Sequence, residues 1–168
     1  MCIRDSFWNL TTATPTVKIE TEDPHDTHPA NRQLSNGTTT FAVTMLTAGD
    51  WDITATDLAP VGALSPQTVE NVPVSVGEAV KLQVVLPGET ADPGSSPTGN
   101  GKTSDPPDDQ TAGVMFVVTV NCTDEYWNVN QSVTQWVRVT TNDPYDICLL
   151  YTSPSPRDLS TSRMPSSA

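Results

Sequence analysis

Two histidines lie close together with an aspartate between them. His25, Asp26 and His28 carry imidazole and carboxylate groups, which are ligands for transition metals. They stand between Pro24 and Pro29, and the sequence has no further histidine to complete a tetrahedral set. We therefore interpret this segment as a solvated turn and predict no metal-binding residues.

Catalysis is disfavoured for a related reason. A Ser-His-Asp arrangement needs a histidine on a rigid element beside its nucleophile, whereas both histidines here lie in one turn. A carboxylate pair of the glycosidase type depends on separation in space, which sequence does not give. Many of the acidic residues flank Pro, Gly or Asn in expected loops. We predict no enzyme and no catalytic residue.

Three acidic pairs offer the hard oxygen ligands that calcium prefers. They are Glu22-Asp23, Asp108-Asp109 and Asp124-Glu125. None has the regular spacing of a dedicated calcium loop, so solvated surface is the favoured interpretation. Calcium held at a domain junction stays open as an alternative.

A short glycine-containing run resembles the end of a phosphate-binding loop. In Gly99-Asn100-Gly101-Lys102-Thr103, the earlier glycine of that motif would stand at position 96, where the sequence has Ser96. The motif also needs a helix after it, and the Pro- and Asp-rich residues 104–109 are a poor helix start. We predict a loop and no nucleotide or other cofactor.

Two aromatic-asparagine pairs could suggest a sugar-stacking site. They are Trp8-Asn9 and Trp127-Asn128, and they recur at a fixed distance. Recurrence favours a structural role, in which Trp packs beneath a turn and Asn adopts an unusual backbone angle.

The pairs belong to a longer internal repeat. Phe7 and Tyr126 are 119 positions apart, and Pro24 and Pro144 are 120 apart. A period of this size exceeds solenoid units and matches tandem small domains. The matching positions between these ends are Val17, Ile19, Thr21 and Asp23 with Val137, Val139, Thr141 and Asp143.

Both ends of the chain resemble translated sequencing-adapter DNA. Residues 1–6 correspond to ATG TGT ATA AGA GAC AG and one further base, and residues 148–158 correspond to an opposite adapter arm. Residues 162–168 fit the translation of the flow-cell DNA sequence that follows the index of such an adapter. We therefore assign 1–6 and 148–168 as adapter-derived and exclude them from fold reasoning.

The remaining residues 7–147 are strongly acidic. They hold five basic and eighteen acidic residues, and Cys122 is their one cysteine. Such a surface repels phosphate backbones and anionic lipids, so we expect neither nucleic acid nor membrane contact. A single cysteine excludes an intrachain disulfide framework, so core burial has to hold the fold.

Period-two patterns indicate an all-β fold, and no helical apolar periodicity persists for three turns. Residues 41–45 and 51–55 are predicted to form a hairpin around a turn at 47–50. The further expected strands are 16–21, 72–76, 80–86, 114–121 and 132–141.

Residues 87–112 form a Pro/Gly-rich segment with almost no large apolar side chain, typical of a long loop. Apolar strands precede and follow it, so we expect it to join the first two strands of one domain. The domain boundary is placed near 75–78. We thus expect 7–76 to hold the later strands of one domain and 77–147 the early strands of the next.

Several motifs resemble a known family. Residues 37–44, Thr47-Ala48-Gly49 and residues 53–57 are similar to the "tttF-vT-taG-tiTatD" signature of bacterial immunoglobulin-like tandem repeats (Big-type or filamin-like) in large surface or secreted proteins. The start of the next repeat is resembled by residues 81–83, 86–90, 110–113, 118–120 and Trp127-Asn128, with a departure at Asn121-Cys122, where a small apolar residue is more usual. The resemblance implies immunoglobulin-like β-sandwiches, here a tandem repeat fragment or two halves packed as one permuted sandwich.

The resemblance implies a non-catalytic stalk, spacer or adhesion module, extracellular or at the cell surface. Its partners would be neighbouring repeats, with surface glycans or other proteins as further candidates. The alternatives are a carbohydrate-binding or spacer module of a secreted glycoside hydrolase, and a calcium-dependent adhesin domain. Because a sandwich scaffold hosts many functions, the fold itself does not choose between them.

Overall fold

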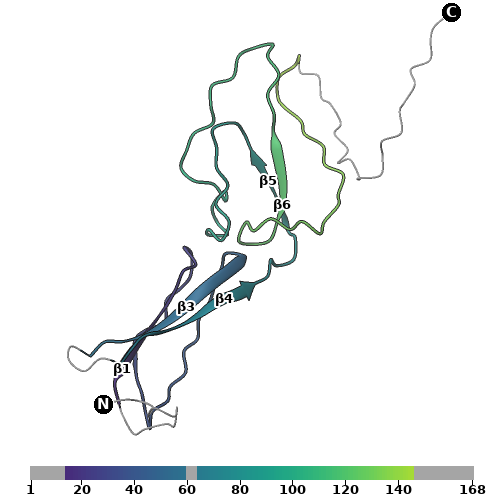
Figure 1. Ribbon diagram of the computed structural model, residues 1–168. Coiled ribbons are helices and arrows are strands. Elements are labelled where there is room, and N and C mark those ends of the chain that lie inside the picture. Colours follow the sequence, from purple (N-terminus) through teal and green to yellow (C-terminus); the bar gives the residue numbers. More distant parts are fainter. Residues whose placement is uncertain (1–13, 60–63, 146–168) are drawn as a thin grey trace, which may run out of the picture. The chain divides into compact units, whose positions relative to one another are not determined.

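The chain folds as an all-β protein. The computed structural model describes residues 14–59 and 64–145, and within them there is no helix and all strands pair antiparallel in two sheets (Figure 1). This arrangement is consistent with a β-sandwich. Contacts divide the chain into two compact units, Met1–Asn130 and Gln131–Ala168, and both sheets belong to the first. The Trp8-Asn9 pair and the adapter-like ends lie outside the described residues.

The first sheet has four strands in the order β2-β1-β3-β4. Its central strand pair is β1 and β3, in which Val17 lies opposite Asp57 and Thr21 opposite Ile53. Because β4 takes the other edge of β3, both edges of β3 are hydrogen-bonded. The strands are β1 Thr16–Thr21, β2 Arg32–Gln33, β3 Gly49–Asp57 and β4 Gln67–Val74.

A β-bulge interrupts the β3–β4 ladder. The register shifts between Trp51 and Ile53, so that Asp52 faces two residues of β4. One of them, Asn71, has a φ of 56°. Its N–H donates to the Asp52 carboxylate at 2.9 Å, and this bond supports the left-handed conformation.

The second sheet consists of β5 Lys81–Val85 and β6 Thr119–Thr123. The two strands pair from Lys81 opposite Thr123 to Val85 opposite Thr119. The predicted loop 87–112 lies in the connection between them, where one isolated bridge joins Ala91 to Lys102.

Few large apolar side chains of the described residues are buried. Val17 belongs to β1, Leu34 directly follows β2, and Trp127 lies after β6. Most strand positions of β3 are half-buried rather than enclosed. Many apolar side chains remain more than one-third exposed, among them Val69, Leu82, Val84, Val114, Met115, Phe116, Val117, Trp136 and Tyr145.

Several predicted strands agree with the structure. The strand expected at 16–21 has the bounds of β1. The strands expected at 72–76 and 80–86 overlap β4 and β5, and 51–55 lies inside β3. The boundary expected near 75–78 falls in the connection between β4 and β5, and the division into domains stays a prediction.

The hairpin predicted between 41–45 and 51–55 is wrong. Both edges of β3 are taken by β1 and β4, and the only bridge of 41–45 joins Thr44 to Thr27. The turn expected at 47–50 is also shorter, since β3 begins at Gly49. The backbone N–H groups just before β3 are bound instead by side chains described below.

Two other expected strands are wrong in part or whole. Within 114–121 only Thr119 onwards belongs to β6, because β5 ends at Val85 and Pro87 has no N–H to extend the ladder. Residues 132–141 form no strand. They match β1 in sequence, but β3, the strand that pairs with β1, has its other edge taken by β4 and so has no free edge for them.

Candidate functional site

The carboxylate of Asp23 organises the segment before β3. Asp23 is buried and accepts hydrogen bonds from the N–H groups of His25 at 3.0 Å, Leu46 at 2.7 Å and Thr47 at 3.0 Å. Burial is the largest influence on the pKa of Asp23 and raises it. The hydrogen bonds, those of Thr47 first, together outweigh burial and lower the pKa below its ordinary value.

Asp124 plays the same part in the turn after β6. Its Oδ1 accepts from the N–H groups of Tyr126 at 2.9 Å and Asn128 at 3.0 Å. Its Oδ2 accepts from the N–H of Gly77 at 2.9 Å and from Nδ2 of Asn128 at 3.0 Å. Burial is again the largest single influence on the pKa of Asp124 and raises it. The hydrogen bonds together outweigh burial and bring this pKa below its ordinary value, so the carboxylate stays ionised at neutral pH.

The unusual backbone angle of this turn belongs to Trp127, not to Asn128 as predicted. Trp127 has a φ of 66°, and its N–H donates to the carbonyl of Asp124 at 3.3 Å. A left-handed conformation costs a bulky residue about 1–2 kcal/mol. It is held because Asp124 binds the backbone on both sides of Trp127.

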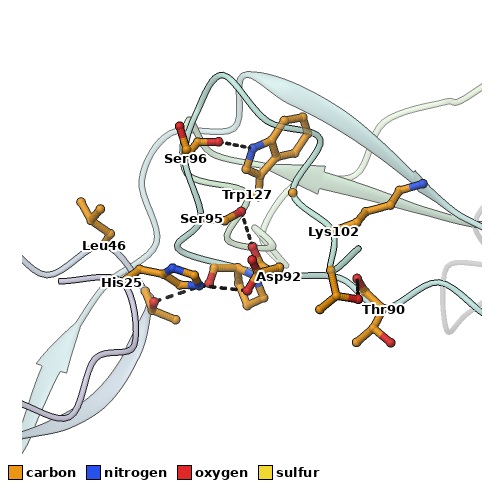
Figure 2. Close-up of polar contacts among 12 residues, drawn as sticks. His25, Leu46, Thr90, Asp92, Ser95, Ser96, Lys102 and Trp127 are labelled. Atoms are coloured by element: carbon orange, nitrogen blue, oxygen red, sulfur yellow. Dashed lines mark hydrogen bonds and ion pairs between the residues drawn. The ribbon is translucent and has the colours of Figure 1, made fainter. Parts of the chain in front are cut away.

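The predicted burial of Trp127 is confirmed. Its indole Nε1 donates to the carbonyl of Ser96 at 3.1 Å, as Figure 2 shows. The Lys81 ammonium lies 4.3 Å from the ring centroid, at cation–π distance. Gly101 lies so close to the ring that a Cβ there would overlap it. The indole is thus enclosed by the loop between β5 and β6.

Asn128 links the turn to the segment before β3. Its Nδ2 donates to the carbonyl of Leu46 at 2.8 Å, and its Oδ1 accepts from the N–H of Ala48 at 2.9 Å. The Asn128 side chain is buried and lies eighty residues from Ala48 in sequence. One amide group thereby makes two hydrogen bonds to the backbone of Leu46–Ala48.

The two histidines point to different carboxylates. His25 Nε2 lies 2.9 Å from Oδ1 of Asp92, a contact drawn in Figure 2, and His28 Nδ1 lies 3.0 Å from Oδ1 of Asp26. They therefore do not converge on one ion. In the ranges 14–59 and 64–145, no group of three or more His, Cys, Asp or Glu side chains is placed to hold a metal.

The phosphate-loop-like run is built into the loop between β5 and β6. Lys102 makes an ion pair with Glu89 at 2.6 Å, and this lysine holds the pKa of Glu89 below its ordinary value. The N–H of Thr103 donates to the carbonyl of Thr90 at 3.0 Å. Figure 2 shows Lys102 and Thr90 in this loop. The lysine that would contact a phosphate is therefore occupied.

The structure brings one residue of an acidic pair, Asp23, and one residue of an aromatic-asparagine pair, Asn128, to the same segment, whereas Asp108 of another acidic pair lies elsewhere. Asp23 and Asn128 both bind the Leu46–Ala48 segment. Asp108 instead lies against Gly88, in the loop after β5. Asp92, which contacts His25, was not singled out by sequence. The one sequence feature of Asp92 is that it precedes Pro93, and an acidic residue before proline is common in loops.

Comparison with protein-family models, with curated proteins and with solved structures gives no match. Within the described part of the chain, no helix is long and apolar enough to cross a membrane.

Proposed function

We propose that this chain is a non-catalytic, immunoglobulin-like repeat module that serves as stalk, spacer or adhesion unit of a bacterial cell-surface or secreted protein. The all-β fold is compatible with such a module. The buried polar side chains fix the positions of loops, which is a structural role. Asp23, Asp124 and Lys102, which carry the most suggestive charges, are bound to backbone N–H groups or to a partner charge.

One observation supports the proposal most directly: two segments 120 positions apart in sequence have the same local backbone hydrogen bond. In the first copy, the N–H of His25 donates to Oδ1 of Asp23 at 3.0 Å. In the second, the N–H of Tyr145 donates to Oδ1 of Asp143 at 2.9 Å. At both places a bend precedes the aspartate and a turn begins at the proline that follows it. Residues 120 positions apart thus form the same Asx turn, as expected of tandem copies of one unit.

A stalk or spacer works mechanically. Each repeat buries its own core, and the junctions between repeats set reach and stiffness. The neighbouring repeats of the parent chain are the partners that this proposal requires.

The coding sequence that flanks this segment provides the test. We expect further copies of the Trp-Asn and Thr-Ala-Gly motifs at a period of 119–120 residues, and a cell-surface anchor or export signal. A flanking catalytic domain with no further copies would contradict the stalk. It would favour an accessory module of a secreted glycoside hydrolase.

That second candidate has one observation in its favour. Trp136 and Tyr145 expose 82% and 89% of their surface, and exposed aromatic rings stack on sugars. Binding to polysaccharides, measured with the full chain and with Trp136→Ala, would separate the two. The calcium-dependent adhesin is less favoured, because Asp23 and Asp124 already bind backbone N–H groups.

A further inference from the structure

The segment Leu46–Ala48 has its backbone polar groups bound almost completely by side chains. The N–H groups of Leu46 and Thr47 donate to Asp23, and the carbonyl of Thr47 accepts from the indole of Trp51 at 2.7 Å. Of these two partners, Trp51 is near the segment in sequence, whereas Asp23 precedes Leu46 by 23 residues. The remaining two groups described, the carbonyl of Leu46 and the N–H of Ala48, are bound by Asn128.

The Asn128 amide is presented to this segment in a fixed orientation. Its own N–H and its Nδ2 both bind the Asp124 carboxylate, which also binds the N–H of Gly77. Asp124 thus joins the residues just before β5 to the turn just after β6. A side chain held in this way loses little conformational entropy when it binds a second partner.

A second set of contacts joins the same two regions. His25 meets Asp92 at 2.9 Å, and the hydroxyl of Thr47 lies 3.5 Å from the carbonyl of Pro93. The next residue, Gly94, donates its N–H to the carbonyl of Tyr126 at 2.7 Å. Gly94 has a φ of 85° and lies against Thr47 and His25 where a Cβ would not fit. Figure 2 shows His25 and Asp92 facing each other beside Leu46.

We propose that the Leu46–Ala48 segment, with His25, is the docking surface for the next repeat along the chain. The partner is a second copy of the repeat, recognised through its aromatic-asparagine turn and the loop 92–94. This inference rests on the proposed tandem function and specifies its junction.

The contact makes the junction a joint rather than a free hinge. Only residues 75–80 connect β4 to β5, so the linker is short. Two amide hydrogen bonds, one histidine–aspartate contact and a glycine packed against Thr47 add fixed points across it. A free hinge would leave these groups to water.

Residual dipolar couplings of the full chain test the joint directly. We expect the N–H vectors of β3 and β5 to fit one alignment tensor, because the two sheets are fixed to each other. Two different tensors in the unmodified chain would overturn the proposal. This measurement does not depend on whether any variant folds.

Hydrogen exchange tests the residue that forms the joint. In Asn128→Ala we expect exchange at the Ala48 N–H to accelerate about tenfold, the loss of one hydrogen bond. Asn100→Ala, which removes an exposed loop asparagine, should leave it unchanged. Protection at Tyr126, bound by Asp124, reports whether the turn itself survives.

An unchanged Ala48 rate in Asn128→Ala with Tyr126 still protected would overturn the role of Asn128. If the Ala48 and Tyr126 amides both lose protection in Asn128→Ala, the turn itself is lost and a second variant is needed. Gly94→Ala serves this purpose, because its added Cβ would overlap Thr47. It should separate the alignment tensors of the two sheets, and a shared tensor in that variant would overturn the joint. Flanking sequence without further repeats would instead contradict the tandem function while leaving these measurements intact.

Discussion

At the scale of single residues, buried polar groups define this protein more than apolar ones do. Asp23, Asp124 and Asn128 are each nine-tenths or more buried, and each makes several hydrogen bonds to backbone groups. Because an unpaired buried polar group is costly, these side chains specify the positions of the segments that they bind. They place loops, where apolar packing alone would not.

Thr123 is the exception among the described buried side chains. It is fully buried at the end of β6, and its hydroxyl has no hydrogen-bond partner. Thr123→Val removes that hydroxyl and keeps the shape, so we expect the free energy of unfolding to rise by about 1 kcal/mol. Thr119→Val, on an exposed position of the same strand, is the control. Urea denaturation measures both, and a loss of stability in Thr123→Val would show that the hydroxyl is paired.

Sequence could locate some of these residues but not their roles. The repeated Trp-Asn pair marked the turn, and the burial of Trp127 followed from its recurrence. The positive φ falls on Trp127, however, where Asp124 binds the backbone on both sides, and the Asn128 side chain binds Leu46 and Ala48 instead. Contacts over eighty residues leave no local pattern, so sequence alone could not reveal them.

At the scale of elements, sequence performed best where a strand had both a pattern and a partner. β1 and β5 both alternate in sequence, and each pairs within its own sheet, although in β5 it is Gln83 that is buried and not its apolar neighbours. Residues 41–45 alternate equally well but find both edges of β3 occupied. Competition for an edge is a property of the sheet, which a segment's own residues do not encode.

The dipeptide Asn36-Gly37 is a sequence signal for a tight hairpin turn. Asn36 and Gly37 have φ values of 49° and 77°, and Ser35 and Thr38 bridge each other around them. This is the Asn-Gly hairpin turn in which both central residues have positive φ. It lies directly after β2, the short strand that was not predicted.

The loop between β5 and β6 depends on one glycine beside the indole. Gly101→Ala would introduce a left-handed alanine at φ 68° and overlap Trp127, so we expect a loss of at least about 2 kcal/mol in stability. Gly113→Ala has a similar φ of 80° and open space around it, so it should cost about 1 kcal/mol. Thermal melting of the pair isolates the overlap. Equal losses would show that the indole moves aside freely.

At the scale of the whole molecule, net charge and buried carboxylates act in opposite directions. The chain carries a formal charge of −12 at pH 7, so partial neutralisation relieves repulsion as pH falls. Asp23 and Asp124 have lowered pKa values in the folded state. Their contribution is therefore complete above the unfolded value of about 4 and is lost as pH falls through the lower, folded value.

We expect a stability profile that is flat or rising from pH 7 to about pH 5 and that falls below about pH 4. Asp124→Asn should flatten the acid limb, because the asparagine does not titrate there. Chemical denaturation monitored by tryptophan fluorescence between pH 2.5 and 7 measures both proteins. An acid limb of equal steepness in the variant would remove Asp124 as its cause.

Asp23 and Asn128 bind the Leu46–Ala48 segment mainly through N–H and C=O groups of its main chain. Main-chain groups are the same in nearly every residue, proline apart. The joint therefore tolerates exchange of the side chains at positions 46 and 48, whereas His25, Thr47 and Gly94 contribute through their own side chains or close packing. Repeats that keep these three residues could diverge elsewhere in sequence and still fit end to end.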